Sequence, residues 1–145
     1  MSDVTGEDVR DIISAELSRL GAAVEVVTYP KGSILWQIGD PADFVGLIVH
    51  GEVALKKALP MYGKPIILEM LWDRDFLGEC VFRDEGRRET LAEAMQPCQL
   101  AILRRATLER LKEDDPQSLN GLLQTILLSV SRRLTRMSNR LTRLF

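Results

Sequence analysis

The sequence contains few of the residues that usually build catalytic or metal-binding sites. Among its 145 residues there is one histidine, His50, and there are two cysteines, Cys80 and Cys98. No Ser/His/Asp or Cys/His set can be assembled around His50, which we interpret as a turn residue, and no H-x-x-x-H or C-x-x-C pair occurs. We therefore expect a protein that is not an enzyme, with no catalytic residues, no bound metal and no cofactor.

Other features are missing as well, and each absence excludes a class of protein. Two cysteines are too few for a disulfide framework, so we interpret both as reduced thiols of a cytoplasmic protein. No apolar run reaches the roughly 18 residues of a membrane-spanning helix, and the acidic segment 1–11 is unlike a secretory signal. The formal net charge of −2 gives no overall reason to expect nucleic-acid binding.

The middle of the chain has the pattern of a β-structure. Short apolar segments rich in valine and isoleucine alternate with breaks at Gly32, Gly39, Gly51 and Gly63. About eight strands at such spacing predict a β-sandwich of the jelly-roll type. The clearest strand segments are residues 24–28, 34–38, 44–49, 52–57, 65–71 and 99–103.

Helices are predicted on both sides of the strand region. The capping pair Thr5 and Asp8 begins an N-terminal helix with apolar residues at helical spacing, and Gly21 ends it. A short helix over residues 106–113 is expected to follow the last strand. The fold class is therefore mainly β with flanking helices.

A long C-terminal helix is the strongest secondary-structure prediction. Asp115 suits the N-cap, Pro116 suits the first helical position, and no proline follows. Seven apolar side chains recur at 4-3 spacing, which predicts a coiled-coil seam. They are Leu123, Leu127, Val130, Leu134, Met137, Leu141 and Leu144. Since so regular a seam needs a partner, we predict a parallel homodimer. The alternative is a helix that folds back on its own barrel.

The same helix carries five arginines and no acidic residue after Asp115. They are Arg132, Arg133, Arg136, Arg140 and Arg143. A basic helix can meet nucleic acid or a membrane surface, but we favour a solvated face whose arginine stems pack along the seam. The helix divides the chain into a β-domain, residues 1–115, and a helical segment, residues 116–145. No residues follow that would form a recognition helix, so we expect no DNA-binding domain.

Residues 76–80, followed by Arg88, combine groups that suit a cyclic ribose phosphate. Gly78 lets the backbone approach an anion closely, and successive N–H groups in such a turn can form an anion-binding nest. Arg88, nine residues after Glu79, supplies a planar fork matched to phosphate oxygens. Glu79 can accept a hydrogen bond from a sugar hydroxyl.

This segment resembles the phosphate-binding cassette of cyclic nucleotide-binding domains. Such domains occur in catabolite-activator-type regulators, cyclic-nucleotide-gated channels and kinase regulatory subunits. Gly78, Glu79 and Arg88 match the G-E-x-x-x, loop, R-[ST/A]-A pattern, and residues 39–53 resemble the G-D-x-x-[DE]-x…I-x-x-G-x-V run upstream of it. The resemblance covers about residues 7–140 and implies the same fold as the strand pattern, with a dimerising helix at the C-terminal end.

The resemblance also implies a ligand, cAMP or cGMP, held inside the barrel. Backbone N–H groups of residues 78, 80 and 81 and the side chain of Arg88 would bind its phosphate, and Glu79 its ribose. Occupancy would then change the angle of the long helix and be transmitted through the dimer. The ligand-binding residues implied are Gly78, Glu79, Cys80, Val81, Arg88, Glu89, Thr90, Thr135, Ser138 and Asn139.

The sequence departs from the family pattern just after Arg88. Glu89 stands where the family has serine, threonine or alanine, and Thr90 where it has alanine. A carboxylate repels a neighbouring phosphate unless its side chain turns away. Strand alternation predicts that Thr90, Ala92 and Ala94 face inward and Glu89 faces outward.

Glu89 therefore leaves several functions open. In the absence of ligand, we expect Arg88 to pair with Glu79 or with Glu89. One alternative to a nucleotide sensor is a degenerate member of the family that binds no nucleotide and acts as a dimeric protein-interaction module. Another is a truncated transcription regulator, for which the arginine-rich helix is weak support.

Overall fold

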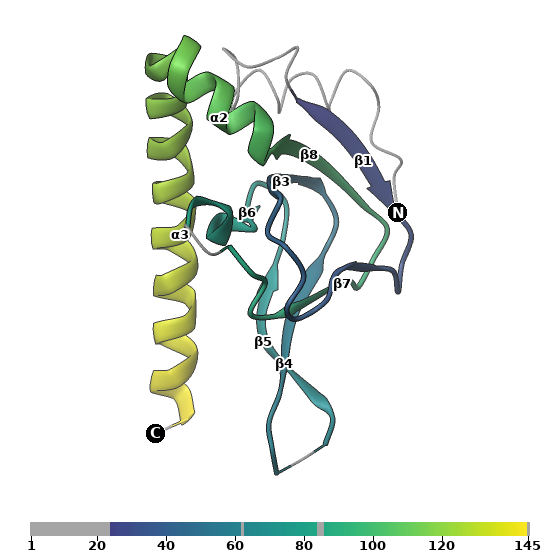
Figure 1. Ribbon diagram of the computed structural model, residues 1–145. Coiled ribbons are helices and arrows are strands. Elements are labelled where there is room, and N and C mark those ends of the chain that lie inside the picture. The colour runs from purple at the N-terminus through teal and green to yellow at the C-terminus, as the bar shows by residue number, and fades with distance from the viewer. Residues whose placement is uncertain (1–23, 62, 84–85, 145) are drawn as a thin grey trace.

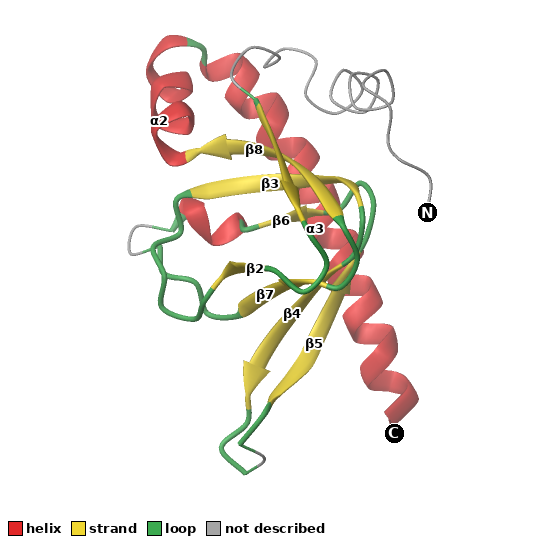
Figure 2. Ribbon diagram, turned by 90° about the vertical axis from the view of Figure 1, so that its right-hand side faces the viewer, coloured by secondary structure: helices red, strands yellow, loops and turns green. Residues whose placement is uncertain are grey.

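The computed structural model describes residues 24–61, 63–83 and 86–144, which form a two-layered antiparallel β-sandwich with helices along one side (Figure 1; Figure 2). The first sheet has the strand order β1-β8-β3-β6 and the second has the order β2-β7-β4-β5. The strands are β1 (Glu25–Tyr29), β2 (Ile34–Trp36), β3 (Phe44–His50), β4 (Val53–Ala58), β5 (Pro65–Leu71), β6 (Phe76–Leu77), β7 (Leu91–Ala94) and β8 (Cys98–Arg104). The jelly-roll β-sandwich is thus confirmed, while the predicted N-terminal helix lies outside the described residues.

The six predicted strand segments are all present, and their ends shift by at most two residues. His50 is the last residue of β3 rather than a turn residue, and its Nδ1 lies 3.5 Å from an oxygen of Asp73. The strand β6 was not predicted, because two residues are too few to display a period of two. The 3-10 helix η2 (Glu79–Phe82), which follows it, was missed as well.

The central strand β3 separates two hydrophobic cores. Successive side chains of a strand point to opposite faces, and nearly every residue of β3 is buried. Val45 and Leu47 pack toward the helices, whereas Phe44 and Ile48 pack toward the second sheet. A strand buried on both faces explains why this segment reads as a continuous apolar run.

Two helices cover the outer face of the first sheet, α2 (Arg105–Asp114) and α3 (Pro116–Leu144). Asp115 caps α3, since its carboxylate accepts the backbone N–H of Ser118 at 3.2 Å. Leu122 and Ile126 bury their side chains in the core beneath α3. Within the described residues, no helix is long and apolar enough to cross a lipid bilayer.

The predicted seam on α3 divides into two parts. Its five leucines are 38–76% exposed, which leaves an apolar stripe without a partner among the described residues. The other two residues turn toward the barrel: Val130 packs against the core and Met137 lines a cavity. The helix therefore folds back on its own barrel by one face, as the alternative prediction has it, and presents the leucines on another.

Side chains of α3 also cover the free side of the edge strand β6. The hydroxyl of Ser129 accepts the backbone N–H of Phe76 at 2.9 Å, and Arg133 donates to the carbonyl of Phe76 at 3.1 Å. The backbone N–H and the carbonyl of Phe76 thus both have hydrogen-bond partners, although β6 is an edge strand. Because Gly78 follows β6 directly, α3 also fixes the position of the turn that contains it.

Candidate functional site

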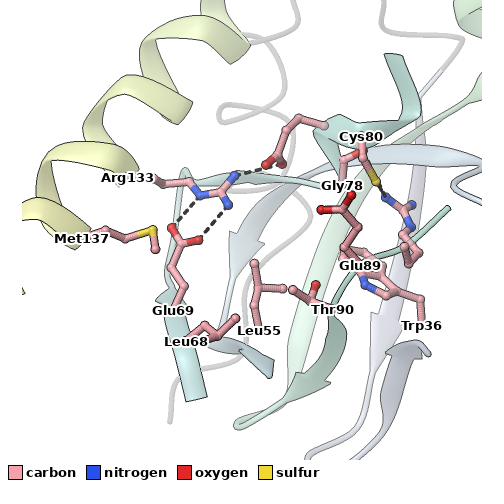
Figure 3. A pocket seen from close by; sticks show the side chains of 12 residues that line it. Trp36, Leu55, Leu68, Glu69, Gly78, Cys80, Glu89, Thr90, Arg133 and Met137 are labelled. Atoms are coloured by element: carbon pink, nitrogen blue, oxygen red, sulfur yellow. Dashed lines mark hydrogen bonds and ion pairs between the residues drawn. The ribbon is translucent and has the colours of Figure 1, made fainter. Parts of the chain in front are cut away.

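A cavity of about 230 Å³ lies between the second sheet, the turn after β6 and the helix α3. Figure 3 shows Arg133 and Met137 reaching toward it from α3, with Gly78, Cys80 and Trp36 on the opposite side. Its wall is formed by Trp36, Leu55, Leu68, Glu69, Gly78, Glu79, Cys80, Arg88, Glu89, Thr90, Arg133 and Met137. Six of the ten predicted ligand-binding residues are among them, and they come from two separate stretches of sequence, residues 78–80 and 88–90.

Arg88 is held at the wall of this cavity by contacts to both terminal nitrogens and to the face of its guanidinium group. Its side chain is 2% exposed. One terminal nitrogen donates to the carbonyl of Gly78 at 3.1 Å and to the sulfur of Cys80 at 3.4 Å, and the other donates to the carbonyl of Phe44 at 2.7 Å. The guanidinium carbon lies 4.0 Å from the centroid of the Trp36 ring, within the range of a cation–π interaction.

The expected pairing of Arg88 with Glu79 or Glu89 is wrong. Both carboxylates have other cations, because Arg133 donates to Glu79 at 2.9 Å and Arg83 donates to Glu89 at 2.8 Å. Among the described residues, no carboxylate lies within ion-pairing distance of Arg88. Within the described part of the chain, the groups that contact this positive charge are backbone carbonyls, a thiol and two aromatic rings.

Arg133 is a charged residue of the cavity wall whose position the sequence analysis missed. The expectation of a solvated arginine face is wrong here, because the Arg133 side chain is only 7% exposed. It donates two hydrogen bonds to Glu69, at 2.8 and 2.9 Å, and a third to Glu79 at 2.9 Å. Burial alone lowers the pKa of Arg133, but the two carboxylates outweigh burial and raise it above the usual value for arginine.

A neighbouring arginine on the same face departs from that expectation too. Arg136 donates two hydrogen bonds to the buried carboxylate of Asp75, at 3.1 and 2.6 Å.

The sequence pattern that could have indicated the buried position of Arg133 is a second 4-3-4 spacing on α3, formed by Leu122, Ile126, Ser129 and Arg133. Its two polar members hid it from a search for apolar residues alone.

Gly78 occupies a position that no other residue fits without strain. Its φ of +81° is in the left-handed region, which L-residues with a side chain rarely adopt. A Cβ atom at this position would lie 2.8 Å from a terminal nitrogen of Arg88 and 2.9 Å from the carbonyl oxygen of Phe44. The absence of a side chain at Gly78 therefore allows Arg88 to lie against the turn.

The residues after Arg88 alternate as predicted. Ala92 and Ala94 are fully buried and Thr90 lines the cavity, whereas the side chain of Glu89 is 62% exposed. Glu89 lies at the mouth of the cavity and forms a surface ion pair with Arg83. The family's small residue is thus replaced by a carboxylate whose charge is directed to a cation outside the cavity.

The other four predicted ligand-binding residues do not line this cavity in the single chain. Val81 is buried in the core, and its backbone N–H donates to the carbonyl of Gly78 at 3.1 Å, so it is already in use. Thr135 and Ser138 are exposed on α3. Asn139 lines a second cavity of about 530 Å³ between β5 and the end of α3.

The charges in the cavity define what it can bind. Three carboxylates line it, and each is paired with an arginine other than Arg88. What remains is one buried cation beside a glycine turn and a carboxylate, Glu79, that is 39% exposed. This set suits a small ligand with an anionic group and a hydroxyl. His50, the one histidine, is not part of the wall.

Comparison with known proteins agrees with this geometry. The family model for the cyclic nucleotide-binding domain matches residues 26–115. The chain belongs to this family. The match is to a binding domain and not to an enzyme family. It places the strands, the cassette and α2 of this cyclic nucleotide-binding domain in one continuous unit.

The named relatives and solved structures share about a quarter of their residues with this chain. The chain is 26% identical over 125 residues to a CRP-like cAMP-activated global transcriptional regulator of Mycobacterium tuberculosis, covering 86% of this chain and 54% of that protein. It thus spans about half the length of the curated relatives that it matches. A cyclic nucleotide-binding domain from Methylobacillus flagellatus superimposes with a TM-score of 0.81 at 23% identity, covering 96% and 83% of the two chains. The N-terminal domain of a transcriptional regulator from Streptomyces coelicolor superimposes with a TM-score of 0.67 at 26% identity, covering 95% of this chain and 96% of that domain.

Proposed function

We propose that this cyclic nucleotide-binding domain is a regulatory sensor that binds cAMP or cGMP in the cavity beside Arg88. The observation that carries the proposal is the buried charge of Arg88. An unpaired ionised group is costly to bury, and Arg88 is 2% exposed with no carboxylate partner among the described residues. A ligand phosphate would supply the missing negative charge.

The other residues of the cavity take roles that follow from their positions. Gly78 lets Arg88 lie against the turn at the cavity wall, and Cys80 borders the same cavity. Glu79 keeps a partly exposed carboxylate that can accept a ribose hydroxyl. The volume of about 230 Å³ falls below the usual range of ligand pockets, about 300–1,000 Å³, so the cavity would have to widen as a nucleotide enters.

Arg133 offers a route by which occupancy would reach the helix. It lies on α3 and bonds to Glu79, the carboxylate proposed to receive the ribose. A hydroxyl that competes for Glu79 would weaken one contact of α3 and leave the contact with Glu69 intact. We propose that α3 pairs with α3 of a second copy through its exposed leucine stripe, so that a change in the helix is passed to the dimer in the cytoplasm.

Isothermal titration calorimetry with cAMP and cGMP tests this function. Cyclic di-GMP belongs in the same panel, because a regulator of Xanthomonas campestris described as c-di-GMP-responsive shares the fold at 22% identity. We expect wild type to bind a cyclic mononucleotide, and a concentration of 100 Kd to add about 2.7 kcal/mol of stability. Arg88→Ala should abolish binding, whereas Arg87→Ala, at the exposed neighbour, should not. Equal binding by wild type and Arg88→Ala would place the ligand elsewhere.

A nucleotide-free interaction module is the second candidate, and Glu89 favours it. A carboxylate at the cavity mouth repels a phosphate, and Arg83 offsets this charge only through an exposed pair. On this alternative, wild type binds no nucleotide and Glu89→Ser alone gains weak affinity. On the sensor proposal, Glu89→Ser tightens binding that wild type already has. A truncated transcription regulator would share the binding behaviour of either.

A further inference from the structure

Two buried N–H donors at one wall of the cavity have no acceptor among residues 24–61, 63–83 and 86–144. They are Nε of Arg88 and Nε1 of Trp36, and solvent reaches neither. Buried donors without an acceptor are rare in folded proteins, and each one calls for a specific explanation. The other two side-chain atoms of this kind among the described residues, in His50 and Gln99, do not belong to the wall of this cavity.

The two donors lie on side chains that are stacked on each other. Trp36 ends β2 and lies opposite Ala92 of β7, whose small side chain leaves room for the indole. Its ring meets Phe44 edge-on, with centroids 5.7 Å apart and an interplanar angle of 67°. The guanidinium of Arg88 lies over both rings, with its central carbon 4.0 Å from the indole centroid and 4.9 Å from the centroid of Phe44.

We infer that Trp36 is a second anion donor of the site and positions Arg88 for the ligand. This inference rests on the proposed function, in which a phosphate enters beside Arg88. Its oxygens would accept the indole N–H of Trp36 together with Nε–H of Arg88, while the indole ring holds the guanidinium plane. Because both donors are buried in this structure, the stacked pair would shift together as the phosphate enters.

A purely structural role for Trp36 is the competing explanation, since the ring also belongs to the core between the sheets. The two roles depend on different parts of Trp36, because packing needs the ring and anion binding needs the Nε1–H group. Trp36→Phe keeps an aromatic ring for packing and for Arg88 but removes the donor. Trp36→Leu removes the ring as well. Thermal unfolding of each variant reports any loss of packing separately from a loss of binding.

The indole N–H resonances in a ¹H–¹⁵N spectrum give a direct readout. The chain has two tryptophans, so Trp36→Phe assigns both signals and Trp72, outside this cavity, is the internal control. On saturation with cAMP or cGMP, we expect the Trp36 signal to move downfield and its hydrogen exchange to slow, while the Trp72 signal keeps its exchange rate. Trp36→Phe should weaken binding about tenfold, the effect of one lost hydrogen bond, and Trp36→Leu should weaken it further.

Each result decides between defined explanations. Bound nucleotide with an unmoved Trp36 signal, or equal affinity of wild type and Trp36→Phe, would overturn this inference and leave the proposed function intact. Lower affinity of Trp36→Phe with a matching loss of thermal stability would assign Trp36 a structural role, again overturning the inference. Absence of binding by wild type would overturn both proposals.

Discussion

Removing the guanidinium of Arg133 should destabilise the fold far more than the loss of an ordinary helix arginine. The side chains of Arg133 and Glu69 are 7% and 10% exposed, and both oxygens of Glu69 accept hydrogen bonds from Arg133. Arg133→Ala leaves the Glu69 carboxylate buried without a cation, a change that typically costs about 3–5 kcal/mol. For a chain of this size, each kcal/mol lowers Tm by roughly 2–4 °C, so we expect a fall on the order of 10 °C.

Urea unfolding of matched variants measures this cost. Arg132→Ala is the control, because Arg132 is the exposed neighbour on the same helix and should cost little. The double variant Glu69→Leu with Arg133→Met should recover much of the loss, since a packed apolar pair often replaces a buried ion pair at little cost. If Arg133→Ala loses no more stability than Arg132→Ala, or if the double variant is worse than the sum of its parts, the burial argument fails.

Three further predictions test other parts of the fold. Gly78→Ala should lower stability by about 1–3 kcal/mol through its left-handed backbone and should displace Arg88, so thermal unfolding and nucleotide affinity should fall together. Leu134→Glu should place a charge on the exposed leucine stripe and convert a dimer into a monomer; a monomeric wild type in sedimentation would contradict the seam. Burial raises the pKa of the Cys98 thiol above 9.0. As the pH rises, the unfolded chain loses this proton at a lower pH than the folded protein does. The free energy of unfolding should therefore fall above about pH 9, and fall less in Cys98→Ala.

The parts of the fold that the sequence predicts are those with a local cause. Strand β5 could be assigned with its correct ends because Pro65 and the apolar run to Leu71 lie next to each other in the chain. The cap at Asp115 is equally local, since its carboxylate bonds to a residue three positions on. The pattern of Gly78, Glu79 and Arg88 identified the cavity because these residue types suit a phosphate by their chemistry alone.

Contacts between distant segments were beyond the reach of such reasoning. Arg133 and Glu69 are 64 residues apart, and nothing in the sequence of either segment indicates the pair. The pairing of Glu89 with Arg83 likewise depends on how the intervening residues turn. Once these carboxylates have other partners, Arg88 cannot take the role expected of it, and it is held by carbonyls and by Trp36 instead. The error at Arg88 thus follows from two missed pairs, Arg133 with Glu79 and Arg83 with Glu89.

The two faces of α3 show why one periodic pattern supported two readings. In a helix, positions three and four apart share a face, and α3 carries two such sets offset by about one residue. The leucine set is complete in apolar residues and was therefore found first, yet it is the exposed one. The set that packs on the barrel ends in Ser129 and Arg133, which serve Phe76, Glu69 and Glu79 rather than the apolar core. Because Ser129 and Arg133 make the hydrogen bonds to the barrel, the leucines stay available for contact with a second copy. The two predictions for α3, packing on its own barrel and pairing in a dimer, therefore concern two faces of one helix.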